Sequence, residues 1–368
     1  MRPTGFADGA PVGRVKASAY TIPTDAPEAD GTLEWDSTTL VVVEVEAGGE
    51  TGLGYTYSDV SIVSLIENKL AETIAGRPAL DIAGANAAMW RAIRNLGRSG
   101  LAATAISAVD AALWDAKAKL FGVPVATLLG RRRDSVEIYG SGGFTSYTDE
   151  QLRNQLVGWI ERDGCRAVKM KIGSEPDRDP QRVKTARRAI GGAGLFVDAN
   201  GAFAAKEALG LAERLVEDDV SWFEEPVSSD DIAGLALMRS AVPKGVDIAA
   251  GEYGYNLDDF HRLLPVVDVL QADMTRCGGV TGFMQVAALC EAHHVDLSGH
   301  CAPAMHLHAA CAAPRLRHLE WFHDHVRIEH MLFDGAPIPR DGRIAPDLSR
   351  PGFGLEFKAC DAERYRVH

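Results

Sequence analysis

The chain has 368 residues, and 51 acidic side chains against 38 basic ones give it a formal net charge of −13. This acidic balance repels phosphate backbones and anionic lipids, so it argues against binding to nucleic acids or membrane surfaces. With 46% hydrophobic and 24% charged residues, the composition is that of a folded globular protein. The length allows two domains, or one large barrel with additions.

The sequence lacks the features of a membrane protein and of a disulfide scaffold. No stretch approaches the roughly 20 apolar residues of a membrane span, and residues 1–13 lack the apolar segment of a signal peptide. The six cysteines form no CxxC pair, so we expect reduced and mostly buried thiols. These features predict a cytoplasmic protein.

Residues 1–130 carry the pattern of a small α+β domain. Hydrophobic and polar side chains alternate in residues 14–22 and 38–46, and Gly48-Gly49 then leads into residues 52–57. Alternation around such a turn predicts an antiparallel sheet. Helical patterns follow in residues 58–75, 85–96 and 101–121. Strands followed by helices indicate an α+β domain.

From residue 131 to 333 the sequence repeats one unit, a short β-branched or aromatic run followed by an amphipathic helix. Eight such runs occur, at 136–139, 167–172, 195–199, 220–225, 246–250, 267–272, 295–298 and 318–322. Strands that alternate with helices pair in parallel, and eight units of this length favour a closed α/β barrel. An open doubly wound sheet stays possible, but the GxGxxG motif expected after its first strand is missing.

The last segment, residues 334–368, is rich in proline and glycine and has no helical period. We expect it to fold back onto the N-terminal domain. The chain is thus predicted to divide near residues 130 and 333.

Acidic side chains follow three consecutive strands of the predicted barrel. Asp198, Glu224 and Glu252 stand at the carboxyl ends of the third, fourth and fifth runs, where barrel enzymes carry their chemistry. Carboxylates so close together repel one another, so either they bind protons or a cation lies between them. Oxygen ligands without cysteine or histidine favour a hard divalent ion. The sequence therefore predicts one Mg²⁺ per subunit at these residues.

The second strand holds two lysines. Lys169 and Lys171 are two positions apart, so both side chains point to one face, while Val168 and Met170 point to the other. This alternation favours lysines that face the barrel interior. Burial and a neighbouring ammonium group both disfavour protonation, so we expect a lowered lysine pKa and a general base at this position.

An aspartate and a histidine follow the sixth and seventh strands. Asp273 comes after the sixth run and His300 after the seventh. A carboxylate that accepts a hydrogen bond from one ring nitrogen fixes the tautomer and raises the basicity of the other. We therefore expect an acid/base pair. Successive steps from Lys171 through the acids to His300 are 21 to 28 residues long, about one βα unit each.

Four other histidines allow a different chemistry. His306 and His308 stand in the segment after the seventh strand, and His323 and His325 follow the eighth. A zinc-dependent barrel hydrolase uses histidine pairs, but at strand ends. We expect His306 and His308 to be helix residues, and the HDH run at 323–325 to be a polar loop on the rim.

At these positions the sequence resembles the enolase superfamily, and within it the mandelate racemase subgroup. The matching motifs extend over nearly the whole chain and are VKMKIG, VDAN, WFEEP, AGE, ADMTRCGGVTG, SGH and HLEWF. The resemblance implies a TIM-like (β/α)₇β barrel with an α+β capping domain that the C-terminal segment completes. It also implies an enzyme that removes the proton α to a carboxylate with the help of Mg²⁺.

The resemblance further implies roles for single residues. Asp198, Glu224 and Glu252 would bind the metal. Glu225 would not bind it directly but would lie next to the ligands. Lys171 is one base, and His300, oriented by Asp273, is the other base on the opposite face of the substrate.

Lys169 and Glu320 are expected on either side of the substrate carboxylate. The resemblance implies that Lys169 lowers the pKa of Lys171 and that Glu320, in a protonated or strongly donating form, hydrogen-bonds to the carboxylate. It suggests Asn200 and Ser141 as weaker substrate contacts.

The resemblance implies an enediolate intermediate, whose extra negative charge Mg²⁺, Lys169 and Glu320 stabilise. We expect dehydration of an acid sugar to a 2-keto-3-deoxy acid, because that outcome dominates in the subgroup. Racemisation or epimerisation of a 2-hydroxy acid by the same lysine and histidine is the alternative. A zinc hydrolase and a non-catalytic barrel are alternatives of other classes.

Two segments of the cap, residues 21–35 and 54–59, are expected to be loops that finish the substrate pocket. Candidate wall residues are Tyr20, Trp35, Tyr55 and Tyr57. The first segment holds four acids and neither lysine nor arginine, which favours a monocarboxylate polyol over a diacid. The expected partners are therefore a small carboxylate substrate and, since relatives form oligomers, further copies of the chain.

Overall fold

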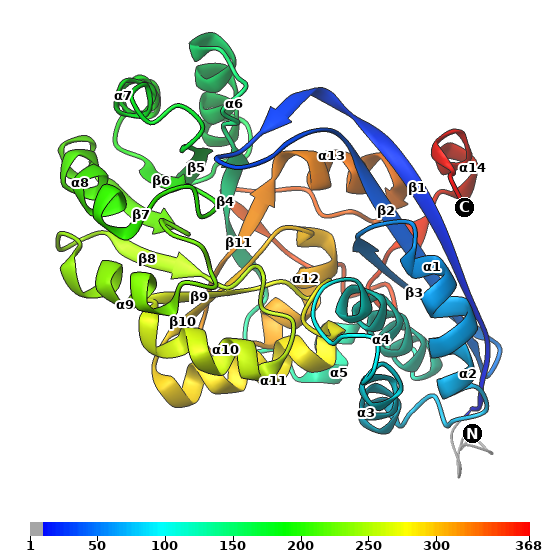
Figure 1. The fold of residues 1–368 in the computed structure, drawn as a ribbon. Helices are drawn as coiled ribbons and strands as arrows, with labels where there is room; N and C mark the ends of the chain where they lie inside the picture. Colours follow the sequence, from blue (N-terminus) through cyan, green and yellow to red (C-terminus); the bar gives the residue numbers. More distant parts are fainter. Residues whose placement is uncertain (1–9) are drawn as a thin grey trace.

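The computed structural model describes residues 10–368. A closed barrel of parallel strands surrounded by helices fills one side of the molecule, and an N-terminal antiparallel sheet with its own helices lies on the other (Figure 1). The predicted α/β barrel with an α+β cap is therefore confirmed.

All eight predicted barrel strands are present. They are β4 (Val136–Gly142), β5 (Ala167–Lys171), β6 (Gly194–Asp198), β7 (Val220–Glu224), β8 (Asp247–Ala250), β9 (Val269–Ala272), β10 (Asp296–Gly299) and β11 (Leu316–Phe322). Each strand pairs in parallel with the next, and β11 pairs with β4, for example at Leu319 and Ile138. This last pairing closes the barrel and rules out the open doubly wound sheet.

Helices cover the outside of the barrel. They are α6 (Asp149–Glu161), α7 (Asp179–Ile190), α8 (Ala205–Leu215), α9 (Ile232–Ala241), α10 (Leu257–Leu263), α11 (Gly279–His293), α12 (Pro303–Ala312) and α13 (His323–Leu332), with short 3-10 turns η2 (Val216–Asp218) and η3 (Leu264–Val266). In α8 the buried positions are three, one and three residues apart and so share one face. This amphipathic pattern packs a helix against a sheet.

The cap is built on an antiparallel sheet of β1 (Val12–Ala29), β2 (Glu34–Ala47) and β3 (Glu50–Tyr57). Its helices are α1 (Ile62–Leu65), the π-helical η1 (Ile66–Leu70), α2 (Ala71–Ile74), α3 (Ile82–Ala92), α4 (Leu101–Leu120) and α5 (Val125–Leu129). The alanine-rich α4 lies close on β3, since a Cβ atom at Gly52 would come within 2.0 Å of the Ala112 carbonyl oxygen. Small residues on both elements allow this contact.

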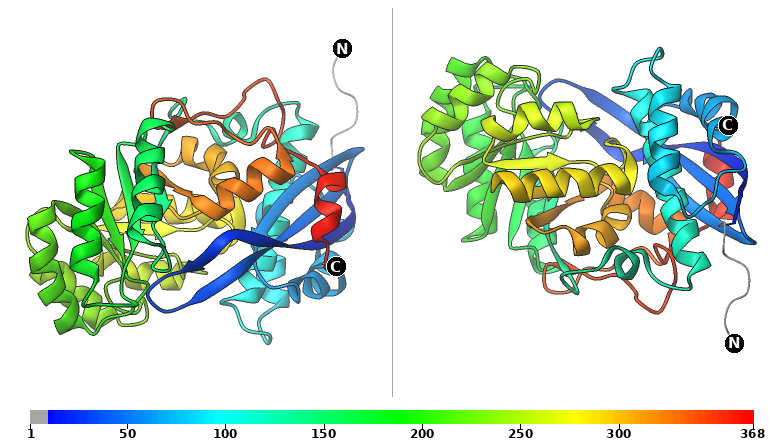
Figure 2. Two further views of the ribbon diagram at one scale, coloured as in Figure 1. Left: turned by 90° about the horizontal axis from the view of Figure 1, so that it is seen from above. Right: turned by 90° about the horizontal axis from the view of Figure 1, so that it is seen from below.

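The two segments predicted as cap loops are mostly strand, so that prediction was wrong. Residues 21–29 belong to β1, and β1 pairs with β2 as far as Ala29 and Glu34, beyond an irregularity after Pro23. The resulting β1–β2 hairpin, residues 21–35, extends from the cap to the barrel (Figures 1 and 2). There the Ala29 carbonyl accepts a hydrogen bond from the Thr145 N–H.

The helix predictions for the cap hold in outline. Helix α4 matches the predicted residues 101–121 closely, whereas α3 begins and ends earlier than the predicted 85–96. The Asp81 side chain accepts a hydrogen bond from the Gly84 N–H and so fixes the start of α3. The predicted helix at 58–75 begins at Ile62 and contains the π-helical turn.

The segment after residue 333 contacts both domains. Short strands β12 (Phe333–Asp334) and β14 (Glu356–Phe357) pair with each other, and β13 (Arg343–Ile344) pairs with barrel strand β4. The chain ends in α14 (Ala359–Ala362) and the 3-10 turn η4 (Glu363–Tyr365), beside β1 (Figures 1 and 2). There Phe357 packs on Tyr20, with ring centroids 5.2 Å apart. The domain boundaries near residues 130 and 333 stay a prediction.

All six cysteines are free, and only Cys360 is exposed, so the expectation of mostly buried thiols is confirmed. Within residues 10–368, every helix is too short or too polar to cross a membrane.

Candidate functional site

Three carboxylates meet at the carboxyl-terminal mouth of the barrel. Asp198 ends β6, Glu224 ends β7, and Glu252 lies two residues beyond β8. One oxygen of each lies within 4.8 Å of the other two, and all three side chains are buried. Parallel pairing places the strand ends at one level, since Asp198 is the register partner of Glu224. This spacing suits a single cation with oxygen ligands.

Lys169 and Lys171 point into the barrel, as predicted, and both are buried among the carboxylates. Lys169 Nζ lies 2.6 Å from Glu224 Oε1 and 3.3 Å from Asp198 Oδ2. Lys171 Nζ donates to Asp198 Oδ2 at 2.5 Å and to Asn200 Oδ1 at 2.9 Å. The two ammonium groups therefore neutralise part of the negative charge at the mouth.

The carboxylates outnumber the cations that face them. Burial, followed by repulsion from Asp198, raises the pKa of Glu224 to about 8. Burial, followed by repulsion from Glu252, raises the pKa of the adjacent Glu225 well above its ordinary value. Without a bound cation, some of these carboxyl groups therefore hold protons.

The predicted low pKa of Lys171 does not hold in this structure. Burial lowers that pKa, and Lys169 lowers it further, but the carboxylates of Asp198, Glu252 and Glu224 together raise it above its ordinary value. The prediction considered burial and the second lysine. It did not consider that the fold places carboxylates against both.

His300 and Asp273 form the predicted pair. His300 Nδ1 lies 2.9 Å from Asp273 Oδ2, and Nε2 lies 2.9 Å from Glu252 Oε2. Thr275 donates to Asp273 Oδ1 through both its N–H and its hydroxyl, which fixes the carboxylate. Burial lowers the pKa of His300, but the carboxylates of Glu252, Glu320 and Asp273 raise it well above its ordinary value.

Glu320 of β11 links the lysines to the histidine. Its Oε1 lies 2.8 Å from Lys169 Nζ and accepts a hydrogen bond from Ser141 Oγ at 2.5 Å. Its Oε2 accepts from the Cys301 N–H at 3.0 Å and lies 3.7 Å from His300 Nε2. Burial raises the pKa of Glu320, but Lys169 and His300 hold it below its ordinary value. The structure therefore favours an ionised Glu320, not the protonated form that was expected.

A cavity of about 280 Å³ lies where these groups meet the cap. From the barrel it is lined by Lys171, Asn200, Glu252, Tyr253, Arg276, His300, Cys301, Glu320 and Phe322. From the cap and α13 it is lined by Asp30, Leu33, Trp35, Ser37, Thr38, Thr39, Tyr57, Ser58 and His325. The β1–β2 hairpin thus supplies one wall, and Trp35 and Asn200 stand where they were expected.

Three other expected substrate contacts lie elsewhere. Tyr20 packs against Phe357 of the C-terminal segment. Tyr55 donates a hydrogen bond to Glu329 Oε1 at 2.6 Å, in the junction between cap and barrel. Ser141 is fully buried under Glu320. The side chains of Tyr20, Tyr55 and Ser141 therefore do not line the cavity.

His306 and His308 are buried helix residues of α12, as predicted. His306 Nε2 accepts a hydrogen bond from the Met274 N–H at 2.7 Å, and His308 Nδ1 accepts one from the Ala126 N–H at 3.1 Å. Burial lowers the pKa of His308 to about 4. Both rings therefore hold neighbouring segments in place, and the zinc-hydrolase alternative loses its histidine pair.

The HDH run at 323–325 is the first turn of α13, so the predicted loop was wrong. His325 is buried and stacks on Tyr57, with ring centroids 3.5 Å apart. Burial lowers the pKa of His325 to about 3, so the ring is neutral. It forms part of the cavity wall together with Tyr57.

Among the lining residues that were not predicted, two contact the acid/base pair. Arg276 lies 3.5 Å from Asp273 and stacks over the Tyr253 ring, and Cys301 contacts His300. The signal for both was local, since Arg276 is part of the ADMTRC motif and Cys301 directly follows His300. Neither residue stands at a strand end in the regular spacing that identified the other site residues.

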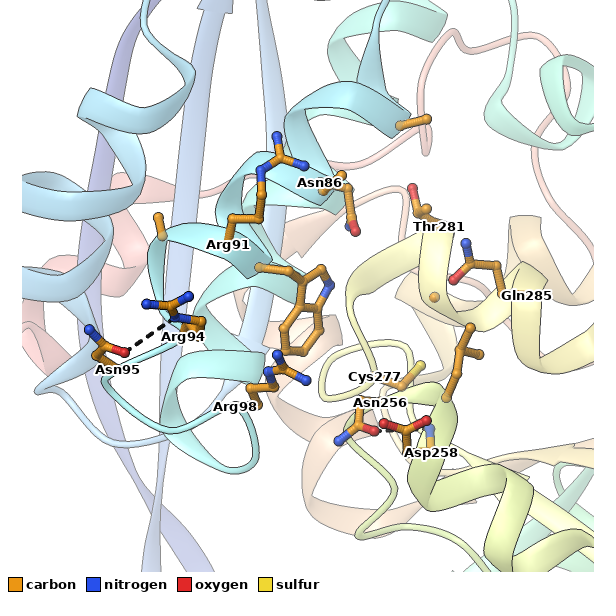
Figure 3. A pocket seen from close by; sticks show the side chains of 16 residues that line it. Asn86, Arg91, Arg94, Asn95, Arg98, Asn256, Asp258, Cys277, Thr281 and Gln285 are labelled. Atoms are coloured by element: carbon orange, nitrogen blue, oxygen red, sulfur yellow. Dashed lines mark hydrogen bonds between the residues drawn. The ribbon is translucent and has the colours of Figure 1, made fainter.

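A larger cavity, of about 650 Å³, lies between α3 and the barrel helices α10 and α11 (Figure 3). Its labelled polar side chains include Arg91, Arg94 and Arg98 near α3, and Asn256, Asp258 and Gln285 on the barrel side. None of the lysines, candidate metal ligands or acid/base residues described above lines it. Because chemistry requires clustered titratable groups, the smaller cavity is the candidate active site.

Two family descriptions match the chain. "Mandelate racemase / muconate lactonizing enzyme, N-terminal domain" matches residues 22–130, and "Enolase C-terminal domain-like" matches residues 151–361. The first match falls on the cap, and the second covers the barrel and most of the C-terminal segment.

Curated proteins and solved structures are similar over nearly the full length. The chain is 31% identical to L-talarate/galactarate dehydratase of Salmonella typhimurium, over 94% of this chain and 89% of the relative. It is 32% identical to 3,6-anhydro-alpha-L-galactonate cycloisomerase of Streptomyces coelicolor, over 93% and 96%. A mandelate racemase/muconate lactonizing enzyme-like protein from Rubrobacter xylanophilus matches with a TM-score of 0.95 and 52% identity, over 97% and 100%. The Salmonella dehydratase liganded with Mg and L-lyxarohydroxamate matches with a TM-score of 0.90 and 29% identity, over 100% and 96%.

Proposed function

Because the chain belongs to the mandelate racemase/muconate lactonizing enzyme family of the enolase superfamily, we propose that it removes the proton α to the carboxylate of a small acid with the help of Mg²⁺. The proposed overall reaction is dehydration of an acid sugar to a 2-keto-3-deoxy acid. The observation that carries the proposal is one cavity lined by Lys171 of β5 and by His300 after β10, which are not neighbouring strands, next to three clustered carboxylates.

The residues at the barrel mouth fit Mg²⁺. Asp198, Glu224 and Glu252 offer oxygen atoms only, which this ion prefers. The raised pKa of Glu224 indicates more negative charge than Lys169 and Lys171 neutralise. The Salmonella dehydratase was crystallised with magnesium. A bound Mg²⁺ would supply positive charge that stabilises the substrate carboxylate as it gains a second negative charge.

Lys171 is the proposed base. Its Nζ lies beside Asp198 at the cavity, and Lys169 stands two residues away on the same face. A neighbouring ammonium group and a cation at Asp198 both favour the neutral amine, which can take the α-proton. Lys169 is buried against Glu224 and Glu320, so it stays charged and makes the potential at the substrate carboxylate more positive.

His300 is the proposed acid. Asp273 holds its Nδ1, so Nε2 is the nitrogen on the cavity side. In the dehydration, Nε2 gives a proton to the β-hydroxyl while the carbon–oxygen bond breaks, water leaves, and the resulting enol tautomerises to the 2-keto acid. Without a leaving hydroxyl, Nε2 can instead give its proton to the α-carbon, while Lys171 keeps the proton it removed, and the configuration inverts.

We propose a monocarboxylate polyol as the substrate class. The lysine and the arginine that line the cavity both already contact acids, since Lys171 contacts Asp198 and Arg276 contacts Asp273. A second carboxylate would instead face Asp30 of the hairpin. Hydroxyl groups suit this wall, because they can donate to Asp30 and exchange hydrogen bonds with Thr38.

The test is a screen of mono- and diacid sugars for 2-keto acid formation in Mg²⁺ buffer, with a carbonyl-specific reagent as the readout. We expect at least one monoacid to react, and both Lys171→Ala and His300→Asn to abolish the product. Turnover above a tenth of wild type in Lys171→Ala would contradict the proposal. A preference for diacids would contradict the substrate class.

Racemisation or epimerisation is the second candidate, favoured by the presence of a titratable group on each of two non-adjacent strands. Incubation of candidate acids in D₂O separates the two. Deuterium at the α-carbon without any 2-keto acid would establish the isomerase and overturn the dehydratase.

A homo-oligomeric assembly and a cytoplasmic location also stay predictions. Sedimentation velocity of the purified chain tests the first, and a monomer at micromolar concentration would contradict it.

A further inference from the structure

We propose that His300, Cys301 and Glu320 form a second metal site, which takes a thiophilic divalent cation such as Zn²⁺ and thereby blocks the active site. This triad combines sulfur, nitrogen and oxygen donors and lies beside the three-carboxylate cluster. It has no part in the mechanism proposed above beyond the separate tasks of His300 and Glu320.

The three donor atoms already have the spacing of zinc ligands. Cys301 Sγ lies 3.3 Å from His300 Nε2 and 3.5 Å from Glu320 Oε2, and these two atoms are 3.7 Å apart. Tetrahedral bonds of about 2.3 Å to sulfur and about 2.1 Å to nitrogen and oxygen place ligand atoms about 3.4 to 3.6 Å apart. The triad therefore outlines one face of a zinc tetrahedron.

The surroundings hold this geometry in place. The side chains of all three residues are buried, and the Cys301 N–H donates to Glu320 Oε2 at 3.0 Å. On the far side of the ring, His300 Nδ1 is bonded to Asp273 Oδ2. A histidine backed by a carboxylate is the usual arrangement behind a metal-bound imidazole, because it fixes the ring orientation.

The donor types separate this site from the magnesium cluster. Asp198, Glu224 and Glu252 present oxygen atoms only, which suit a hard ion. The triad adds a thiol and an imidazole, which select zinc or cobalt over magnesium. A hard ion and a thiophilic ion should thus bind to different groups of residues. The two sites adjoin, since His300 Nε2 lies 2.9 Å from Glu252 Oε2.

Binding requires the loss of a proton from sulfur. Burial raises the pKa of the Cys301 thiol to about 12, so the metal-free thiol is neutral. As the metal–sulfur bond forms, the thiol proton passes to solvent, as for any coordinating cysteine. Nε2 of His300 likewise binds the metal in its unprotonated form. The net result is exchange of protons for one divalent cation.

The site would close the cavity to substrate. His300, Cys301 and Glu320 line it together with Lys171 and Asn200. A cation on Nε2 removes the proton that the proposed mechanism needs and fills the space beside the Lys171 amine. The inhibitory effect rests on the proposed function, whereas the metal site itself does not.

The experiment is a Co²⁺ titration of the full chain in excess Mg²⁺, since cobalt reports a thiolate ligand through a sulfur-to-metal charge-transfer band. Wild type is expected to show this band at one equivalent of Co²⁺. Cys301→Ser should abolish it and weaken binding at least tenfold. The matched control is Cys360→Ser, because Cys360 is free and exposed, and this variant should behave as wild type.

Equal spectra for wild type and Cys301→Ser would overturn the site, as would loss of the band in Cys360→Ser. X-ray absorption of the zinc-loaded wild type needs no variant, and it should detect one sulfur at about 2.3 Å. Absence of that sulfur overturns the site even if Cys301→Ser fails to fold.

Inhibition is read separately. With a substrate in hand, Zn²⁺ should suppress turnover in excess Mg²⁺, and a chelator should restore it. A charge-transfer band without inhibition would overturn the blocking role alone. If no substrate is found, the proposed function fails while the cobalt band still decides the metal site.

Discussion

Inside the barrel, Phe196 and Trp222 stack ring on ring, whereas two residues further along the same strands Asp198 and Glu224 are buried acids. Side chains two apart on a strand share a face, so both kinds point into one interior. We call Tyr139, Phe196, Trp222 and His318 the aromatic level. We call Lys169, Lys171, Asp198, Glu224 and Glu320 the charged level. The two levels share strands β6, β7 and β11 but serve different purposes.

The aromatic level stabilises the fold. The Phe196 and Trp222 ring centroids lie 5.3 Å apart, and His318 lies among the rings, where burial lowers its pKa to about 3 and keeps it neutral. The charged level gains little stability, because removing ions from water offsets most of their attraction. Its charged groups therefore serve the proposed reaction more than they stabilise the fold. Stability and chemistry are thus separated by two residues along β6, β7 and β11.

Lys171→Ala should cause the largest effect on chemistry and a small one on stability. We expect turnover to fall by about 10³-fold, because the general base is lost. With Mg²⁺ present, Asp198 keeps Lys169 and the metal as partners, so the unfolding midpoint should shift less than for any large-to-small change in the aromatic level. Steady-state kinetics and thermal unfolding measure the two effects. Activity above a tenth of wild type would break the division between levels.

Phe196→Ala should do the reverse. Truncation of a buried phenylalanine leaves a cavity and is expected to cost about 3 to 5 kcal/mol of unfolding free energy. Turnover per folded molecule should stay within a few-fold of wild type. Denaturant titration gives the stability, and Phe196→Leu, which fills more of the space, should lose less. Equal losses for both variants would argue against close packing at this level.

Glu329→Gln asks what a buried carboxyl group costs where no cation is expected. Burial raises the pKa of Glu329 to about 8, against an ordinary value of 4.5. Ionisation therefore destabilises the fold, with no cost below about pH 4.5 and the full cost above about pH 8. Relative to Glu329→Gln, wild type should lose up to about 2 to 3 kcal/mol between pH 6 and pH 8. If the unfolding free energies of wild type and Glu329→Gln changed equally with pH across this range, the expected cost of burying the charge would be contradicted.

Trp222→Phe tests the contact between the levels and should have the smallest effect. Trp222 Nε1 donates to Glu224 Oε2 at 2.9 Å, so it orients a proposed metal ligand. Loss of such a supporting bond is expected to weaken Mg²⁺ binding about tenfold. Trp321→Phe is the control, because that ring is also buried but packs against His330. Equal Mg²⁺ affinities for both variants would show that the levels are independent.

The charged level could be predicted from the sequence because its residues stand in recognisable positions on each strand. The alternation in VKMKI directs Lys169 and Lys171 inward, and regular spacing along the chain places Asp198, Glu224 and Glu252 at one end of the barrel. The pKa of Lys171 could not be predicted in the same way. It depends on carboxylates from other strands, and the sequence alone does not give their distances.

The predicted loop in the cap was wrong for a related reason. Residues 21–35 were expected to form a pocket loop, and they contain Pro23, Pro27 and four acids. Pairing between Glu28 and Trp35 holds them as strand nevertheless, and the contact with Thr145 is made only when the barrel is folded. Long-range pairing overrode local composition here. The prediction therefore placed this wall of the cavity correctly but gave it the wrong secondary structure.

The most direct test of the charged level as a cation cage is Mg²⁺ binding by calorimetry, in wild type and Glu224→Gln, each with its unfolding midpoint. Wild type should bind one Mg²⁺ per chain and gain thermal stability from it. Glu224→Gln should bind at least about 100-fold more weakly. Its metal-free midpoint at pH 7 should lie above that of wild type, because burial raises the pKa of Glu224 to about 8 and folding then costs the uptake of a proton that Gln does not need. Undiminished Mg²⁺ binding, or a metal-free loss as large as that of Phe196→Ala, would contradict the account.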